Sequence, residues 1–166
     1  MKRALLLVLV GLSVVLQMSL LPALRPFGVV PNLVLVICAL VALDGSASVA
    51  LVIGVVGGLA LDLASGANFG LWTGVLVLVA LTMGLLHRAG VELAGGLAAI
   101  LVVAVATVVM TVVIWGGLLN TVSNWPVASL SGRLVTEVLS NLILVVALRP
   151  VVRWLLPESV AVVAIG

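Results

Sequence analysis

Charged residues are scarce in this chain. Its 166 residues include seven Lys or Arg and five Asp or Glu, so 7% are charged, whereas 65% are hydrophobic. A soluble domain is about half apolar and about a quarter charged, and a soluble fold of this size could not bury so much apolar surface. The mean hydropathy is +1.55. The composition therefore predicts an integral membrane protein whose main solvent is lipid.

Residue types that often carry chemistry are also rare. The chain has one His, one Cys and no Tyr. A single His cannot form a paired metal site, Cys38 lies in an apolar run, and no Gly-rich loop carries the Lys and Ser/Thr of a nucleotide-binding loop. The basic residues are scattered and form no patch for nucleic acid. We therefore expect no catalytic residues, no metal or cofactor, and no nucleic-acid partner.

One partial match points to an enzyme. Asp44 and Asp62 match two of the four metal-binding aspartates in the signature of CDP-alcohol phosphotransferases, but Val41 and Gly66 occupy the other two positions. The topology derived next places the two acids on opposite membrane faces. We therefore interpret the spacing as a coincidence.

Turn-forming and polar residues divide the chain into six apolar runs. Because a helix needs about 20 apolar residues to cross the hydrocarbon, these runs predict an all-α bundle of six transmembrane helices in one domain over residues 1–166. The first run is longer than the apolar core of a signal peptide and lacks a cleavage site, so we expect it to be retained. The predicted spans are approximately 4–21, 29–43, 47–63, 69–86, 93–119 and 134–156.

The distribution of Lys and Arg predicts the orientation. With six spans, Arg25 and Arg133 lie on one side of the membrane. The other five basic residues lie on the opposite side, namely Lys2, Arg3, Arg88, Arg149 and Arg153. Since cytoplasmic loops carry the excess of basic residues, both termini are predicted to be cytoplasmic. Arg133 is then placed on the outer side, next to the start of the last span.

The third apolar run carries small residues at four-residue spacing, Ala50, Gly54 and Gly58, and the same spacing leads to Asp62. Such a surface lets another backbone approach closely. Asp is disfavoured near a helix C-terminus by the helix dipole, so something must stabilise Asp62. Candidates are the N–H groups of the following turn, Ser65, or an arginine on the same side. The glycine surface either packs within the chain or binds a partner.

The last span carries a polar face. Arg133, Glu137 and Asn141 are spaced i, i+4 and i+8, and Thr136 and Ser140 flank them. A charge in lipid costs about 2.5–3.5 kcal/mol at the helix centre, and an Arg133–Glu137 pair would lower that cost. This face packs against other helices of the chain or contacts a partner or small ligand.

Two further spans have polar pairs at i, i+4. These are Ser13 with Gln17 and Thr107 with Thr111. They indicate either a bundle with a partly hydrogen-bonded interior or hydroxyl groups that bond back to their own helix. The sequence leaves both alternatives open.

Residues 31–80 resemble the rod shape-determining protein MreD family in three places. Pro31-Asn32 opens the second helix, and Gly54, Gly57 and Gly58 space the third. That helix ends in a pattern similar to G-x-x-x-D-x-x-S-G-x-x-x-G, formed by Gly58, Asp62, Ser65, Gly66 and Gly70, with Asn68 in the same turn.

The resemblance implies a multi-pass protein of the bacterial cytoplasmic (inner) membrane that has no catalytic activity. Proteins of this family are scaffolds of the cell-elongation machinery that associate with the bitopic protein MreC. Through MreC they reach RodA, a class B penicillin-binding protein and, in the wider complex, MreB, and they support lateral peptidoglycan synthesis and cell shape. We expect the glycine surface and the turn after Asp62 to help form the contact with MreC. Self-association is left open.

The family is also similar in fold to the S components of energy-coupling-factor transporters. This similarity supplies the alternative function, a vitamin-binding S component. Such a protein needs aromatic and polar side chains around its ligand, and this chain has four Trp, two Phe and no Tyr. The sequence therefore favours the scaffold.

Overall fold

The computed structural model describes residues 2–24, 29–44, 47–65, 70–88, 97–119 and 127–156, and all regular structure in these ranges is helical. The predicted all-α class and the six helical segments are confirmed. The first segment consists of α1, a π-helical turn η1, and α2, which follow one another without a break. The elements are α1 (Lys2–Val15), η1 (Leu16–Leu20), α2 (Leu21–Leu24), α3 (Leu33–Asp44), α4 (Ala47–Ser65), α5 (Leu71–Arg88), α6 (Leu97–Leu119) and α7 (Val127–Leu155).

Three of the described helices are long and apolar enough to cross a membrane. They are Leu5–Ala23, Ala47–Ser65 and Ser131–Leu155. The other three apolar helices are shorter by this measure, namely Leu33–Asp44, Leu71–Leu86 and Ile100–Val112. The chain is therefore built as a membrane protein, and a crossing by all six segments stays a prediction.

The start of the last helix differs from the prediction. α7 begins at Val127, whereas the sequence predicted that the last span begins at residue 134. Arg133 therefore lies within α7. Pro126 precedes α7 in the sequence, and proline favours the first turn of a helix. α7 also packs against α6, and such packing outweighs the weak helix propensity of Ser131 and Gly132.

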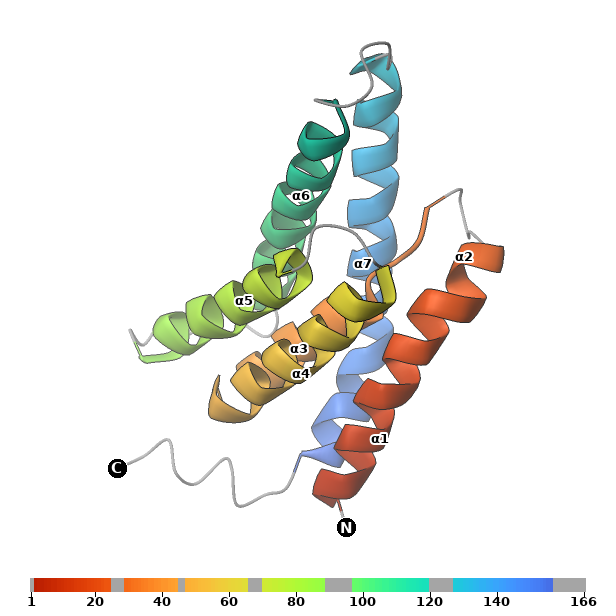
Figure 1. Cartoon of the computed structure of the whole chain (residues 1–166). Helices are drawn as coiled ribbons and strands as arrows, with labels where there is room; N and C mark the ends of the chain where they lie inside the picture. The colour runs from red at the N-terminus through yellow and green to blue at the C-terminus, as the bar shows by residue number, and fades with distance from the viewer. Residues whose placement is uncertain are drawn as a thin grey trace.

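α3 is the central helix of the bundle. It contacts α1, α4, α5, α6 and α7, and no side chain of residues 34–41 is more than 1% exposed. A helix that is apolar on all sides is expected in the core rather than at a surface. Its 12 residues extend about 18 Å, so α3 is shorter than the hydrocarbon thickness of about 30 Å. In Figure 1 α3 lies behind α4.

α4 and α5 lie side by side in opposite directions, and glycine sets their separation (Figure 1). A Cβ atom at Gly58 would lie 2.4 Å from Thr73 Cα, and one at Gly54 would lie 3.1 Å from the Leu76 carbonyl. Gly57 faces Val34 of α3 instead. The glycine surface is thus filled by α5 of the same chain. The contact with MreC expected at this surface and at the turn after Asp62 stays a prediction.

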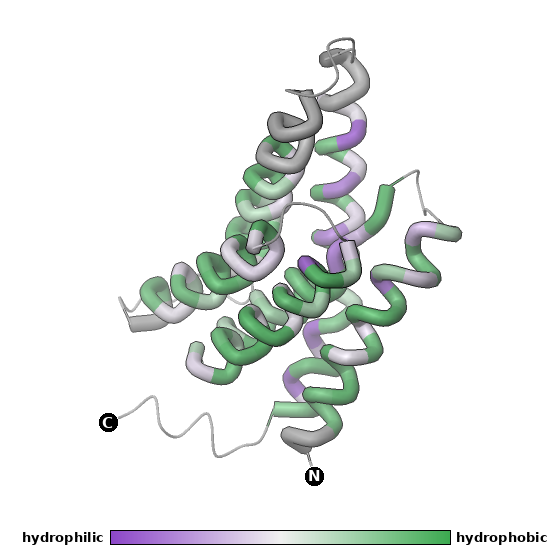
Figure 2. Tube along the Cα trace, in the orientation of Figure 1, coloured by the Kyte–Doolittle hydropathy of each residue, from purple (hydrophilic) through white to green (hydrophobic). Residues whose placement is uncertain are grey.

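The outer surface of the described bundle is hydrophobic. Figure 2 shows hydrophobic residues along most of α4, α5 and the coloured part of α6, whereas the first half of α7 carries several hydrophilic residues. Large apolar side chains that point outward include Val52, Val56 and Leu63 of α4 and Leu101 and Val105 of α6. The start of α1 and the end of α7 lie at the same end of the bundle (Figure 1), as an even number of crossings requires.

The close contact between α4 and α5 predicts a cost for the smallest possible side chain. Gly58→Ala should lower the free energy of unfolding by about 1–3 kcal/mol, because the added methyl group overlaps the Thr73 backbone. Thermal unfolding of the purified protein in detergent measures the effect. Gly74→Ala on α5 is the matched control, since nothing lies within 4 Å of its added Cβ. Equal stability of the two variants would contradict the close contact.

Candidate functional site

The N-terminus of α3 is buried and is satisfied by amide side chains. Asn32 is the N-cap: its Oδ1 accepts the Leu35 N–H at 3.0 Å, and its carbonyl accepts the Val36 N–H at 3.2 Å. An N-cap side chain satisfies one of the N–H groups that the first helical turn leaves without a partner. Pro31 is buried next to it. The predicted opening of the second helix at Pro31-Asn32 is confirmed, although α3 begins at Leu33 and not at residue 29.

Two other helices complete this capping arrangement. Gln17 lies in the π-helical turn η1, and its Oε1 accepts the Val34 N–H at 3.3 Å. Asn141 of α7 accepts the Asn32 N–H on Oδ1 at 2.7 Å. The central helix is therefore held at its start by side chains from the first and the last segments of the chain.

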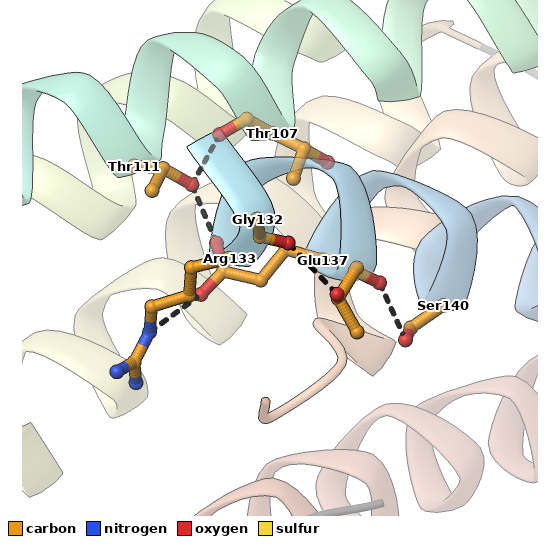
Figure 3. A network of polar contacts seen from close by, with 7 residues as sticks. Thr107, Thr111, Gly132, Arg133, Glu137 and Ser140 are labelled. Carbon is orange, nitrogen blue, oxygen red and sulfur yellow. Dashed lines mark hydrogen bonds and ion pairs between the residues drawn. The ribbon is translucent and has the colours of Figure 1, made fainter. Parts of the chain in front are cut away.

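A polar network continues from Asn141 into α6. Asn141 Nδ2 donates to Thr107 Oγ1 at 2.8 Å. Thr111 Oγ1 lies 2.6 Å from Glu137 Oε2 and 2.8 Å from the Thr107 carbonyl. Figure 3 shows Thr107, Thr111 and Glu137 in this arrangement between α6 and α7. Both alternatives for the polar pairs are thus realised, because these hydroxyl groups bond to their own helix and to α7.

Arg133 and Glu137 form the ion pair that the sequence predicted. Arg133 Nε lies 3.7 Å from Glu137 Oε1, and their side chains are 40% and 19% exposed. The hydroxyl groups of the two flanking residues form hydrogen bonds within α7. Thr136 donates to the Gly132 carbonyl and Ser140 to the Thr136 carbonyl, so both hydroxyl groups are used within α7 (Figure 3).

A cavity of about 240 Å³ lies beside this network, between α3, α5, α6 and α7. Its wall combines charged, amide, hydroxyl, aromatic and apolar groups. The lining residues are Val30, Asn32, Leu35, Trp72, Thr107, Met110, Thr111, Arg133, Glu137 and Asn141. The structure therefore brings Asn32 of the MreD-like stretch together with Arg133, Glu137 and Asn141 of the last helix. Sequence reasoning treated these as two unrelated groups.

Asp62 caps a helix other than its own. Its carboxylate accepts the Trp72 N–H at 2.9 Å, the Thr73 N–H at 3.2 Å and the Thr73 hydroxyl at 2.6 Å. Gly70 occupies the N-cap position of α5, with φ at +93° and its carbonyl accepting the Gly74 N–H. That backbone conformation favours glycine, which has no side chain to cap the helix, so Asp62 supplies the cap from α4. The negative charge also faces the positive end of the α5 dipole.

Of the stabilising groups proposed for Asp62, the backbone N–H groups are confirmed. Ser65 acts at another atom, because its hydroxyl donates to the Asp62 carbonyl at 3.1 Å and not to the carboxylate. Gly66 and Asn68, which belong to the turn of the predicted motif, lie outside the described residues. Arg25 lies outside them as well.

A second ion pair was not predicted. Arg149 of α7 donates from Nε and a terminal nitrogen to the two oxygens of Asp44, at 3.2 and 3.4 Å. This two-point geometry joins the end of α3 to α7 at the opposite end from Asn32. The signal was present in the sequence, because Asp44 and Arg149 were both assigned to the inner membrane boundary. Asp44 and Asp62 thus have separate structural partners at opposite ends of α4.

Comparison of the chain with protein-family models, with curated proteins and with solved structures gave no significant match. Within the described ranges there is also no group of three or more His, Cys, Asp or Glu side chains that could hold a metal ion. The functional interpretation therefore depends on the geometry above and on the sequence resemblance.

The cap from Asp62 predicts a local and a global effect. Asp62→Ala leaves two N–H groups and a hydroxyl at the start of α5 without their acceptor, so stability should fall by about 1–3 kcal/mol. Amide hydrogen exchange at Trp72 and Thr73 should become faster than in the unmodified protein. Ser19→Ala is the control, since that exposed hydroxyl bonds to the Val15 carbonyl of its own helix. Unchanged exchange at both amides would show that the cap is dispensable.

Proposed function

We propose that this chain is a non-enzymatic membrane scaffold of the MreD type, in the cytoplasmic membrane of a bacterium, with both termini in the cytoplasm. It binds MreC and so supports the elongation complex with RodA, a class B penicillin-binding protein and MreB. The observation that carries the proposal is the MreD-like stretch, residues 31–80. Within the described ranges, residues of its motif each have a defined structural role.

Those tasks support a rigid platform. Asn32 caps the central helix, Gly58 lets α5 approach α4, and Asp62 caps α5. Each contact fixes one helix relative to another. A scaffold requires fixed helices and an accessible outer face, which this arrangement provides.

A groove between α5 and α6 is the surface that we assign to MreC in this proposal. It has a volume of about 400 Å³. Nearly all of its wall is apolar, and the lining residues are Val75, Leu78, Val79, Thr82, Leu101, Val102, Val105, Ala106 and Val109. Lipid tails are as apolar as these side chains, so helices associate in a membrane through van der Waals packing. A concave groove offers a single helix such as that of MreC more contact than a convex helix face does.

Co-purification tests the proposal. The tagged chain is extracted from its native host in a mild detergent, and mass spectrometry identifies what is recovered. We expect MreC, with RodA or a class B penicillin-binding protein. Val105→Trp with Val109→Trp should fill the groove and reduce MreC recovery at least about tenfold, the effect of losing about 1.4 kcal/mol of contact.

The matched control carries the same change on the outward face of α4, Val52→Trp with Val56→Trp, where both side chains are exposed. It should recover MreC normally. Loss of MreC with the control but not with the groove variant would move the contact to α4. Absence of MreC from the unmodified protein's complexes would contradict the scaffold function itself.

The alternative is an S component of an energy-coupling-factor transporter. The observation in its favour is the cavity beside Glu137, whose wall includes buried Asn32, Thr107, Thr111 and Asn141. Its volume of about 240 Å³ is below the range of about 300–1,000 Å³ that is usual for small-molecule sites. Recovery of a transporter T component and ATPases in the same purification would support this alternative.

A further inference from the structure

The cavity between α3, α5, α6 and α7 is lined by polar atoms that can form further hydrogen bonds. Glu137 Oε1 has the ion pair to Arg133 at 3.7 Å but no hydrogen bond within the described part of the chain. A carboxylate has about four acceptor sites, and Thr111 occupies one on the other oxygen. Glu137 is therefore able to accept hydrogen bonds from a molecule in the cavity.

Donor groups also face this space. Asn32 uses its Oδ1 for the cap of α3, and no hydrogen bond from its Nδ2 occurs in the described ranges. Asn141 Nδ2 has two hydrogens and donates one to Thr107. Both residues line the cavity and are at most 7% exposed. Each Nδ2 group carries two hydrogens, so both amides can donate a further hydrogen bond to a molecule in the cavity.

The acceptor side of the cavity suits an ammonium group. Glu137 supplies the charge, and the Thr111 oxygen lies 2.6 Å from its Oε2. Trp72 lines the same cavity, and an indole face attracts a cation. One aromatic ring does not form the cage that recognises a quaternary ammonium, whereas the oxygen acceptors require N–H donors. A primary ammonium fits this wall better than a trimethylated one.

The donor side suits an anionic oxygen. Arg133 lines the cavity, and a guanidinium binds phosphate and carboxylate oxygens well. The Nδ2 groups of Asn32 and Asn141 add neutral donors. The Arg133 side chain is 40% exposed. The space corresponds to about eight water molecules at about 30 Å³ each, enough for a small polar group and too little for a large ligand.

We propose that this cavity binds a primary ammonium group that carries an anionic oxygen a few bonds away, with Glu137 holding the ammonium and Arg133 the oxygen. Phosphoethanolamine has this chemistry, both as a free molecule and as the headgroup of phosphatidylethanolamine. The site is independent of the scaffold function, because none of its residues lies in the groove assigned to MreC. Failure to co-purify MreC therefore does not contradict the ligand site. Absence of ligand binding likewise does not contradict the scaffold function.

The first test uses the unmodified protein. Vesicles or nanodiscs with equal amounts of phosphatidylethanolamine and phosphatidylcholine are solubilised, and native mass spectrometry counts the lipids retained. In parallel, soluble phosphoethanolamine and phosphocholine are compared for their effect on thermal unfolding. Preferential retention of the ethanolamine lipid identifies a headgroup site. A higher unfolding temperature with phosphoethanolamine alone, without lipid preference, identifies a free ligand.

Variants then locate the site. Glu137→Gln keeps an acceptor for Thr111 but removes the charge, and the ethanolamine preference should fall about tenfold, as expected for losing a hydrogen bond to a charged group. Thr111→Val is a second variant of nearly unchanged shape that should weaken the same preference. Asp44→Asn is the matched control, because it removes a carboxylate from an ion pair with Arg149 outside the cavity.

The outcomes are distinguishable. No preference for ethanolamine over choline in either assay would overturn the proposal. So would an unchanged preference in both Glu137→Gln and Thr111→Val, measured on protein that elutes as one species with native helix content. An equal loss in Asp44→Asn would also overturn it, since the effect would then come from general destabilisation.

Discussion

A short helix buried on all sides must have the N–H groups of its first turn satisfied by the protein, because neither water nor lipid can do so. α3 is such a helix, and the amide oxygens around its start come from Gln17, Asn32 and Asn141. Leaving one buried donor without a partner costs about 1–3 kcal/mol. The requirement fixes the first and last segments of the chain against the central one. The π-helical turn η1 contributes to this capping arrangement, because Gln17 lies within it.

The same constraint is met differently at α5. There Gly70 occupies the N-cap position with a positive φ, and a glycine has no side chain that could cap the helix. Asp62 provides the missing acceptor from the neighbouring helix, and this is geometrically feasible only because Gly58 brings the Thr73 backbone within contact. Gly58 and Asp62 thus contribute to the same junction between α4 and α5. This explains why they occur together in one sequence motif.

Much of the fold could be predicted from the sequence, because hydropathy marks the six apolar runs and proline or glycine marks their ends. Two features could not. The start of α7 was hidden by Ser131 and Gly132, whose weak propensity is outweighed by packing against α6. The partner of the glycine surface was hidden because Gly54 and Gly58 allow close approach to any backbone. At the candidate site the Arg133–Glu137 pair follows from i, i+4 spacing, whereas contact between Asn32 and Asn141 depends on tertiary structure alone.

The charge on Glu137 is not explained by packing alone. Asn141 and Thr107 join α6 to α7 with neutral groups, and Thr111 needs only an acceptor oxygen, which a glutamine amide at position 137 would also supply. A carboxylate within a membrane helix costs about 2.5–3.5 kcal/mol at the centre, and its pair with Arg133 is long, at 3.7 Å. A salt bridge of that geometry, with one partner 40% exposed, returns little of this cost. In the ligand site proposed above, an ammonium group beside Glu137 would supply the compensating charge that the long pair with Arg133 does not.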